Sequence, residues 1–232
     1  MTTPPNPKRA VVLLSGGLDS STAAAIARSE GYELLTLAFD YGQRHRRELE
    51  AARAVSAALG AADHRVVSFD LRAFGGSALT ADIPVPHGCD TAEMSHDIPI
   101  TYVPGRNLIF LSFATAYAEV MGADDIFLGI NVLDSSGYPD CRPEFLVAFS
   151  ETANLATKAG AQDGRKLHIH APLIEFTKAD IIRRGLALGV PYALTWSCYE
   201  GGEHACGTCD SCLLRLKGFA EVGVTDPISY GN

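Results

Sequence analysis

Glycines, hydroxyls and a carboxylate are concentrated in the stretch SGGLDSST, residues 15–22, directly after an apolar run. Gly16 and Gly17 allow the backbone to turn its N–H groups toward an anion, and serine and threonine hydroxyls add further donors. A carboxylate beside bound phosphates, here Asp19, is best explained by a nearby Mg²⁺ ion, which prefers oxygen ligands. We therefore expect a nucleotide-phosphate site made by Leu14, Ser15, Gly16, Gly17, Leu18, Asp19, Ser20, Ser21, Thr22, Ala23 and Ala24.

This loop does not match the two commonest phosphate motifs of α/β proteins. It lacks the lysine of G-x-x-x-x-G-K-[ST], and it does not follow G-x-G-x-x-G. The sequence S-G-G-L-D-S instead resembles the PP-loop of the ATP-pyrophosphatase families. That resemblance implies that the loop holds the pyrophosphate end of ATP while a substrate oxygen is adenylated. The alternatives are a tight turn with a serine cap and, for Asp19, a favourable charge at a helix N-terminus.

A second group of reactive side chains lies near the end of the chain. Cys206, Cys209 and Cys212 follow C-x-x-C spacing, and Cys198 precedes them. Four thiolates suit one tetrahedral structural Zn²⁺ ion per chain. An iron–sulfur cluster is the main alternative, although the further cysteine and proline of ferredoxin motifs do not follow here. A ligand set that includes the neighbouring glutamate and histidine would leave one cysteine unused.

Apolar runs of strand length alternate with helical patterns along the chain. We expect strands at 9–14, 33–39, 64–69, 125–130 and 166–174, and helices at 21–30, 46–59, 107–122, 145–156, 177–188 and 213–221. This alternation predicts an α/β fold with a parallel, doubly wound sheet and right-handed crossovers. Ligands of such sheets bind at the carboxyl ends of the strands, where the phosphate loop is expected. Thr177 and Asp180 suit a capping-box variant at the start of the helix over 177–188.

The chain divides most simply into one domain with a short appendage. Residues 1–8 are proline-rich and are expected to form a flexible tail. Residues 9–195 would form the nucleotide-binding α/β domain. Residues 196–232 would form a zinc-binding segment packed on the same domain.

Composition limits the class of protein. The chain has 232 residues, 47% of them hydrophobic, with a formal net charge of -8. This charge speaks against a protein whose main role is to grip nucleic-acid phosphates. The first apolar run is shorter than that of a signal peptide, and no window reaches the length of a membrane span. These features predict a cytoplasmic enzyme with a small-molecule substrate, and a homodimer is compatible with them.

From Arg9 to Tyr230 the chain resembles the 7-cyano-7-deazaguanine synthase family of queuosine biosynthesis. The resemblance rests on SGGLDSS, FDYGQRHRRELEAA (39–52), VPGRN (103–107), NVLDSSGYPDCRPEF (131–145), FTKADIIRRGLALGVPYALTWSCY (176–199), CGTCDSC (206–212) and DPISY (226–230). It implies an ATP-dependent ligase that converts 7-carboxy-7-deazaguanine and ammonia into 7-cyano-7-deazaguanine, or preQ0. Adenylation turns a carboxylate into an electrophile that ammonia can attack, giving an amide. A second adenylation, on the amide oxygen, allows elimination to the nitrile.

Further roles are hypotheses from side-chain chemistry. We expect Asp19, Lys178 and Arg106 to be catalytic. The cations Lys178 and Arg106 are candidates for stabilising phosphate charge, unless they are ordinary solvated side chains. Asp134 and Asp140 could accept hydrogen bonds from a guanine-like edge, and Tyr138 could stack on the base. Asp140 could instead be a turn residue and Tyr138 a packed one. We assign no role to His45, Cys89 and Cys141; for Cys141 a small buried thiol is favoured over a nucleophile.

Three other functions compete with this interpretation. A related ligase could join a deazaguanine to a different amine. A tRNA-modifying PP-loop enzyme would need a basic RNA-binding surface, which the net charge of -8 disfavours. A zinc-dependent binding module would leave the glycine-rich loop without a purpose, and ATP binding would distinguish it from an enzyme.

Overall fold

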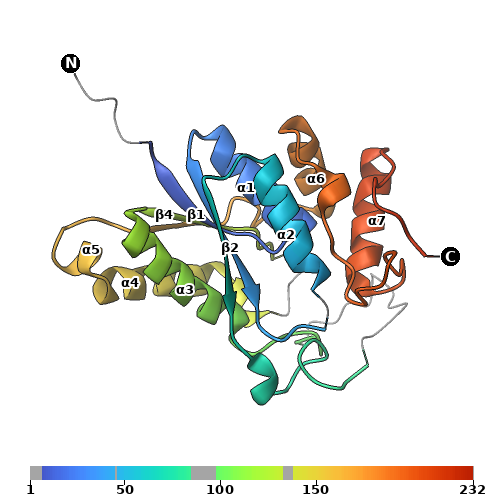
Figure 1. Ribbon diagram of the computed structural model, residues 1–232, viewed down its shortest axis with the longest axis horizontal. Coiled ribbons are helices and arrows are strands. Elements are labelled where there is room, and N and C mark those ends of the chain that lie inside the picture. Colours follow the sequence, from blue (N-terminus) through green and yellow to red (C-terminus); the bar gives the residue numbers. More distant parts are fainter. Residues whose placement is uncertain (1–6, 45, 85–97, 133–137, 232) are drawn as a thin grey trace.

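The computed structural model describes residues 7–44, 46–84, 98–132 and 138–231 (Figure 1). Five parallel strands form one sheet: β1 (Arg9–Leu13), β2 (Glu33–Asp40), β3 (Asp63–Ser68), β4 (Asp125–Leu128) and β5 (His168–His170). Their order across the sheet is β3-β2-β1-β4-β5. The predicted parallel α/β fold is confirmed, and β5 is shorter than the run of residues 166–174 that suggested it.

Helices cover both faces of this sheet. They are α1 (Leu18–Ser29), α2 (Arg47–Ala58), α3 (Arg106–Met121), α4 (Pro143–Ala156), α5 (Lys158–Ala161), α6 (Lys178–Ala187) and α7 (Asp210–Val222). Short 3₁₀ turns lie at η1 (Leu71–Ala73), η2 (Pro139–Cys141) and η3 (Tyr192–Leu194). Figure 1 shows α1, α2, α6 and α7 on one side of the sheet and α3, α4 and α5 on the other.

The alternation of side chains along the strands explains the two layers of helices. In β1, Ala10 and Val12 pack in the core with α1, α2 and α6, whereas Val11 and Leu13 pack in the core with α3 and α4. Successive strand residues point to opposite faces, so a strand buried on both faces reads as a continuous apolar run. The apolar run in the sequence therefore corresponds to a central strand between two cores.

The order of the strands reverses at β1. The chain proceeds outward from β1 through β2 to β3, and then crosses to β4 and β5 on the opposite side of β1. Ligands of open α/β sheets bind in the crevice at such a reversal, outside the carboxyl ends of the strands. The crevice between β1 and β4 is therefore the place at which to look for a site.

A buried arginine on α7 holds the carboxyl-terminal segment together and also joins it to the domain, since an Nη group of Arg215 donates to the carbonyl of Tyr192 at 3.2 Å. Arg215 on α7 donates through Nε and an Nη group to the two oxygens of Asp226, at 2.7 and 2.9 Å. Tyr230 donates to the same carboxylate at 2.6 Å. In the described part of the chain, no helix is both long enough and apolar enough to cross a membrane.

Candidate active site and metal centre

The phosphate loop, residues 15–21, links β1 to α1 and requires its first glycine. Gly16 has a φ of +83°, and a Cβ atom there would lie 2.6 Å from the backbone oxygen of Glu48. The backbone N–H of Trp196 donates to the carbonyl of Gly16 at 2.9 Å. A side chain at this position would therefore be strained and would also push the loop away from α2.

A second close approach fixes the start of α1. Gly129, which follows β4, lies so near α1 that a Cβ atom would sit 2.6 Å from the backbone nitrogen of Ser20. This packing brings the end of β4 against the helix N-terminus, where N–H groups and the helix dipole favour an anion. The geometry is that of an anion site at the predicted edge of the sheet.

The loop hydroxyls divide into two groups. Ser15 and Ser20 are 3.0 Å apart through their Oγ atoms, and both line the crevice. The hydroxyls of Ser21 and Thr22 are fully buried and donate to the carbonyls of Gly17 and Leu18. The structure places the side chains of Leu14, Ala23 and Ala24 in the core. Ser15 and Ser20 are thus the hydroxyls that a ligand in the crevice can reach.

The crevice brings together two charged side chains that the sequence analysis expects to be catalytic, one on α1 and one on α6. Lys178 begins α6, and its Nζ atom lies 2.8 Å from both carboxylate oxygens of Asp19 in the first turn of α1. Asn131, after β4, donates to the same carboxylate at 3.5 Å. The capping box of Thr177 and Asp180 predicted from the sequence is present and sets the start of α6. Lys178 is therefore a half-buried, paired cation instead of a solvated one.

Two adjoining cavities open on this crevice. The polar cavity has a volume of about 250 Å³ and is lined by Ser15, Asp19, Glu48, Arg106, Asn131, Tyr138, Lys178 and Tyr199, among others. The apolar cavity has a volume of about 190 Å³ and is lined by Leu37, Phe39, Tyr41, Phe110 and Leu128, among others. Ser15, Ser20, Glu48, Arg106 and Tyr199 belong to both walls. The polar and apolar compartments therefore form one continuous site.

Arg106 begins α3 and lies between the two cavities. Burial alone would lower the pKa of its guanidinium, but Tyr41, Tyr138 and other acidic groups around it raise the pKa overall. Asp140 is buried, and its carboxylate accepts the backbone N–H of Asn107 at 2.9 Å, so it caps the first turn of α3. Asp140 thus holds the helix end that carries Arg106.

Tyr138 and Cys141 also reach the wall of the polar cavity. The Tyr138 hydroxyl lies 2.9 Å from the hydroxyl of Thr101. Cys141 is buried and accepts a hydrogen bond from Asn107 at 3.2 Å, and burial and Asp140 raise the pKa of its thiol to about 12. A thiol with this pKa is protonated at neutral pH, which argues against a nucleophilic role.

One carboxylate in the cavity wall was not singled out in the sequence. Glu48 lies in the first turn of α2, and burial raises its pKa from the ordinary value of 4.5 to about 7, with Arg106 opposing the rise. The signal was present in the sequence, because a helix that follows the second strand begins at the ligand edge of a parallel sheet. Asp134, His45 and Cys89 lie outside the described residues.

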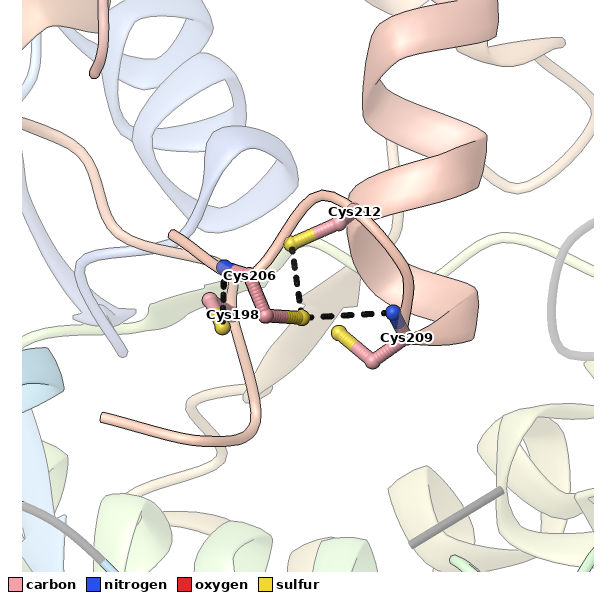
Figure 2. A group of neighbouring side chains, drawn as sticks. All are labelled: Cys198, Cys206, Cys209 and Cys212. Atoms are coloured by element: carbon pink, nitrogen blue, oxygen red, sulfur yellow. Dashed lines mark hydrogen bonds between the residues drawn. The ribbon is translucent and has the colours of Figure 1, made fainter. Parts of the chain in front are cut away.

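The four predicted cysteines converge on one point. The sulfur atoms of Cys198, Cys206, Cys209 and Cys212 all lie within 4.8 Å of one another, and Figure 2 shows the four side chains gathered in one place. A tetrahedral zinc ion with Zn–S bonds of about 2.3 Å separates its sulfur ligands by about 3.8 Å. The donor set and its compactness therefore fit zinc. Among the described cysteines there is no disulfide.

Backbone N–H groups surround these sulfurs. Glu200 and Cys206 donate to the sulfur of Cys198 at 3.4 and 3.3 Å, and Thr208 and Cys209 donate to that of Cys206 at 3.4 and 3.3 Å. Such donors stabilise the negative charge of thiolate ligands. The loop is thus shaped for four thiolates around a cation.

The cysteine segment, residues 196–212, is joined to the phosphate loop. Trp196 bonds to Gly16 through its backbone, and its ring nitrogen donates to the carbonyl of Cys198 at 3.0 Å. The guanidinium of Arg47 on α2 lies over the Trp196 ring, 4.6 Å from its centroid. The four-cysteine site therefore supports one side of the phosphate loop, although its sulfur atoms do not line either of the two cavities.

Comparison with known proteins identifies the family of this chain. A family model described as queuosine biosynthesis protein QueC matches residues 9–223. The 7-cyano-7-deazaguanine synthase of Kineococcus radiotolerans is 63% identical over 95% of this chain and 97% of its own length. That of Myxococcus xanthus is 60% identical over 96% and 97%. The solved structure of NMN synthetase from Francisella tularensis aligns at 19% identity with a TM-score of 0.49, over 94% of this chain and 74% of that one. The chain belongs to the family of queuosine biosynthesis protein QueC.

Proposed function

We propose that this chain is an ATP-dependent carbon–nitrogen ligase that makes 7-cyano-7-deazaguanine from 7-carboxy-7-deazaguanine and ammonia. The observation that carries the proposal is the meeting of Asp19 and Lys178 beside the phosphate loop, at the reversal point of the sheet. A carboxylate for a metal and a cation for a phosphate are both needed to activate a substrate oxygen with ATP. Relatives named 7-cyano-7-deazaguanine synthase support the choice of product, and the carboxylic acid and ammonia are the substrates that we propose for it.

The chemistry requires two activations. A carboxylate is a poor electrophile, and its adenylation creates an acyl phosphate that ammonia converts to an amide. Adenylation of the amide oxygen then makes that oxygen a leaving group, so that loss of AMP gives the nitrile. The protein contributes position and charge neutralisation to both steps.

The two compartments suit the two parts of this task. We assign the triphosphate to the polar cavity, because Ser15, Ser20 and the start of α1 offer donors there. Asp19 would hold Mg²⁺, which neutralises phosphate charge when it is bound. The apolar cavity, with Phe39 and Phe110 stacked 4.0 Å apart in its wall, would take a planar heterocycle.

The substrate would lie between Tyr138 and Arg106. Arg106 is placed to attract a carboxylate or a developing phosphate charge, and Tyr138 to contact the ring. Asp140 would act through the α3 terminus that it caps. Asp134 remains a prediction for recognition of the guanine-like edge.

The test is one incubation of the purified protein with Mg-ATP, 7-carboxy-7-deazaguanine and ammonium, read by mass spectrometry and nucleotide chromatography. Formation of the nitrile together with AMP supports the proposal. AMP without the nitrile, or an adduct with a different amine, would indicate a related ligase. No ATP turnover with the deazaguanine acid would refute the ligase function.

We also propose that the enzyme works in the cytoplasm as a homodimer. Val120 on α3 and Leu155 on α4 are 79% and 82% exposed, and Val147 on α4 is 62% exposed. Exposed apolar side chains that form one patch are typical of contact surfaces, and these three side chains all lie on α3 and α4. Sedimentation at micromolar concentration measures the mass of the assembly, and a monomer at every concentration would contradict the dimer.

A further inference from the structure

Glu48 occupies a position in the site for which the activation chemistry has no use. The backbone of α2 abuts the phosphate loop at Gly16, which places the start of α2 at the rim of the crevice. From there the Glu48 side chain lines both the polar and the apolar cavity. Within the described residues, no hydrogen bond or ion pair engages its carboxylate. A half-buried acid without such a partner, facing a cavity, is suited to bind something that enters it.

The other carboxylates near the crevice are occupied. Asp19 is held by Lys178 at 2.8 Å and is the candidate for the metal. Asp140 is buried and caps α3. The thiol of Cys141, which also lines the polar cavity, is already protonated and therefore cannot accept a proton. Among the described residues of the cavity walls, Glu48 is thus the carboxylate left for a cationic or protonated reactant.

The groups that face Glu48 come from three other parts of the chain. They are Arg106 on α3, Tyr41 after β2 and Tyr199 in the cysteine segment, with Arg44 in the wall beside them. Aromatic rings next to a carboxylate favour a small cation such as ammonium. The positive charge of Arg106 opposes that cation, so it favours neutral ammonia once a proton has been removed.

We propose that Glu48 binds the incoming ammonium ion at the junction of the two cavities and removes its proton, so that neutral ammonia attacks the activated carboxyl carbon. This assignment rests on the proposed ligase function. It goes beyond that function by naming where the nitrogen enters and which residue makes it nucleophilic. It also explains why the carboxylate lies on a wall that both compartments share.

The proton balance of this step is simple. Ammonium gives one proton to the Glu48 carboxylate and becomes ammonia, whose electron pair forms the new C–N bond. The C–O bond to AMP breaks, and the surplus proton on nitrogen passes to the departing phosphate, whose second pKa is about 6. Glu48 then returns its proton to water before the next turnover. No oxidation or reduction occurs.

The pKa of Glu48, raised to about 7 by burial, supports this role. A general base works best when its pKa is close to the working pH, because it is then both ionised and reasonably strong. An ordinary glutamate with a pKa of 4.5 is a much weaker base toward ammonium. Burial in the crevice therefore tunes Glu48 in the direction that the step requires.

The two halves of the reaction provide a selective test. Formation of the amide from the acid consumes ammonia, whereas formation of the nitrile from the amide does not. We expect Glu48→Gln to lower the rate of acid-to-amide conversion at pH 7.5 by about a hundredfold or more. The same variant, supplied with the amide and Mg-ATP, should form the nitrile within about threefold of the wild-type rate. Glu50→Gln, an exposed glutamate on the same helix, is the matched control and should leave both rates unchanged.

Hydroxylamine separates proton removal from mere positioning. It is mostly unprotonated at neutral pH and attacks activated carboxyl groups without help from a base. The Glu48→Gln variant should therefore form the hydroxamate at close to the wild-type rate, although it fails with ammonium. Equal losses in both half-reactions would overturn the proposal in favour of a structural role, as would unchanged amide formation. A wild-type protein that converts neither substrate would instead refute the ligase function itself.

Discussion

The cysteine segment and the phosphate loop reach their geometry by opposite routes. The four sulfurs of the segment come from residues 198–212, and their convergence within 4.8 Å needs only one short loop. At the phosphate loop, Lys178 meets Asp19 across 159 positions of sequence, and that contact depends on the whole sheet. A local motif can therefore be read almost completely from its spacing, whereas a site assembled at a strand crossover is only partly visible before the fold is known.

Removal of zinc should have the largest effect, because it tests whether the local site supports the distant one. We expect one zinc per chain by metal analysis, and loss of the metal in Cys209→Ser, whose sulfur is buried. Binding of structural zinc is worth about 10 kcal/mol or more to a folded site. The link from Cys198 through Trp196 to Gly16 should carry this loss to the loop as weaker ATP binding.

Cys141→Ser is the matched control for this experiment, because Cys141 is also a buried thiol but lies outside the cluster. It should keep the full zinc content. Unchanged ATP affinity in the metal-free Cys209→Ser protein, measured by calorimetry, would show that the two regions are independent.

Loss of the Lys178 cation should have the next largest effect. We expect Lys178→Ala to lower kcat/KM by about a hundredfold in both half-reactions, because phosphate charge develops in each adenylation. Arg183→Ala is the control, since Arg183 is an exposed cation on the same helix that pairs with Asp180. Steady-state assays of AMP release measure both variants. A loss of less than about tenfold, or 1.4 kcal/mol of barrier, would remove Lys178 from the catalytic residues.

Much of this architecture follows from sequence patterns. The predictions of a parallel sheet, of a capping box at Thr177 and of a cysteine cluster are confirmed. The order of the strands in the sheet could not be predicted from the sequence. The motif-based resemblance to the synthase family is confirmed as well. These features depend on periodicity or short spacing, which are local properties.

Other parts of the site required the fold. Trp196 acquires its role only through its backbone contact with Gly16, which no local pattern encodes. The sequence indicates that Glu48 lies near the ligand edge, but not that it lines both cavities. The hydroxyls of Ser21 and Thr22 look like that of Ser15 in the sequence, yet they lie on the buried side of α1, where they donate to the carbonyls of Gly17 and Leu18. The residue types indicated hydroxyl donors for a phosphate, and the position of each residue around the helix decided which hydroxyls reach the crevice.

A smaller effect is expected from crowding at the loop itself. Gly16→Ala should destabilise the fold by about 2 kcal/mol, because it places a side chain at positive φ against the backbone of α2. Gly17→Ala provides the contrast, since Gly17 has an ordinary φ of -77° and its Cβ would meet atoms no nearer than 3.4 Å. Thermal unfolding should show a clear decrease in Tm for the first variant and little change for the second. Equal decreases would indicate that crowding against α2 is not the cause.

A stability difference that is confined to high pH is expected at Glu48. Its pKa is raised from 4.5 to about 7 by burial, so between these values the unfolded chain is ionised more readily than the folded one. Stability that depends on this group is therefore complete at low pH and is lost as the pH rises toward 7. Relative to wild type, Glu48→Gln should gain about 1 to 3 kcal/mol at pH 8 and nothing at pH 4.5, which urea unfolding at the two pH values measures. An equal gain at both values would mean that the carboxylate charge is not what costs stability, and that the cavity does not hold Glu48 in the state that the ammonia step needs.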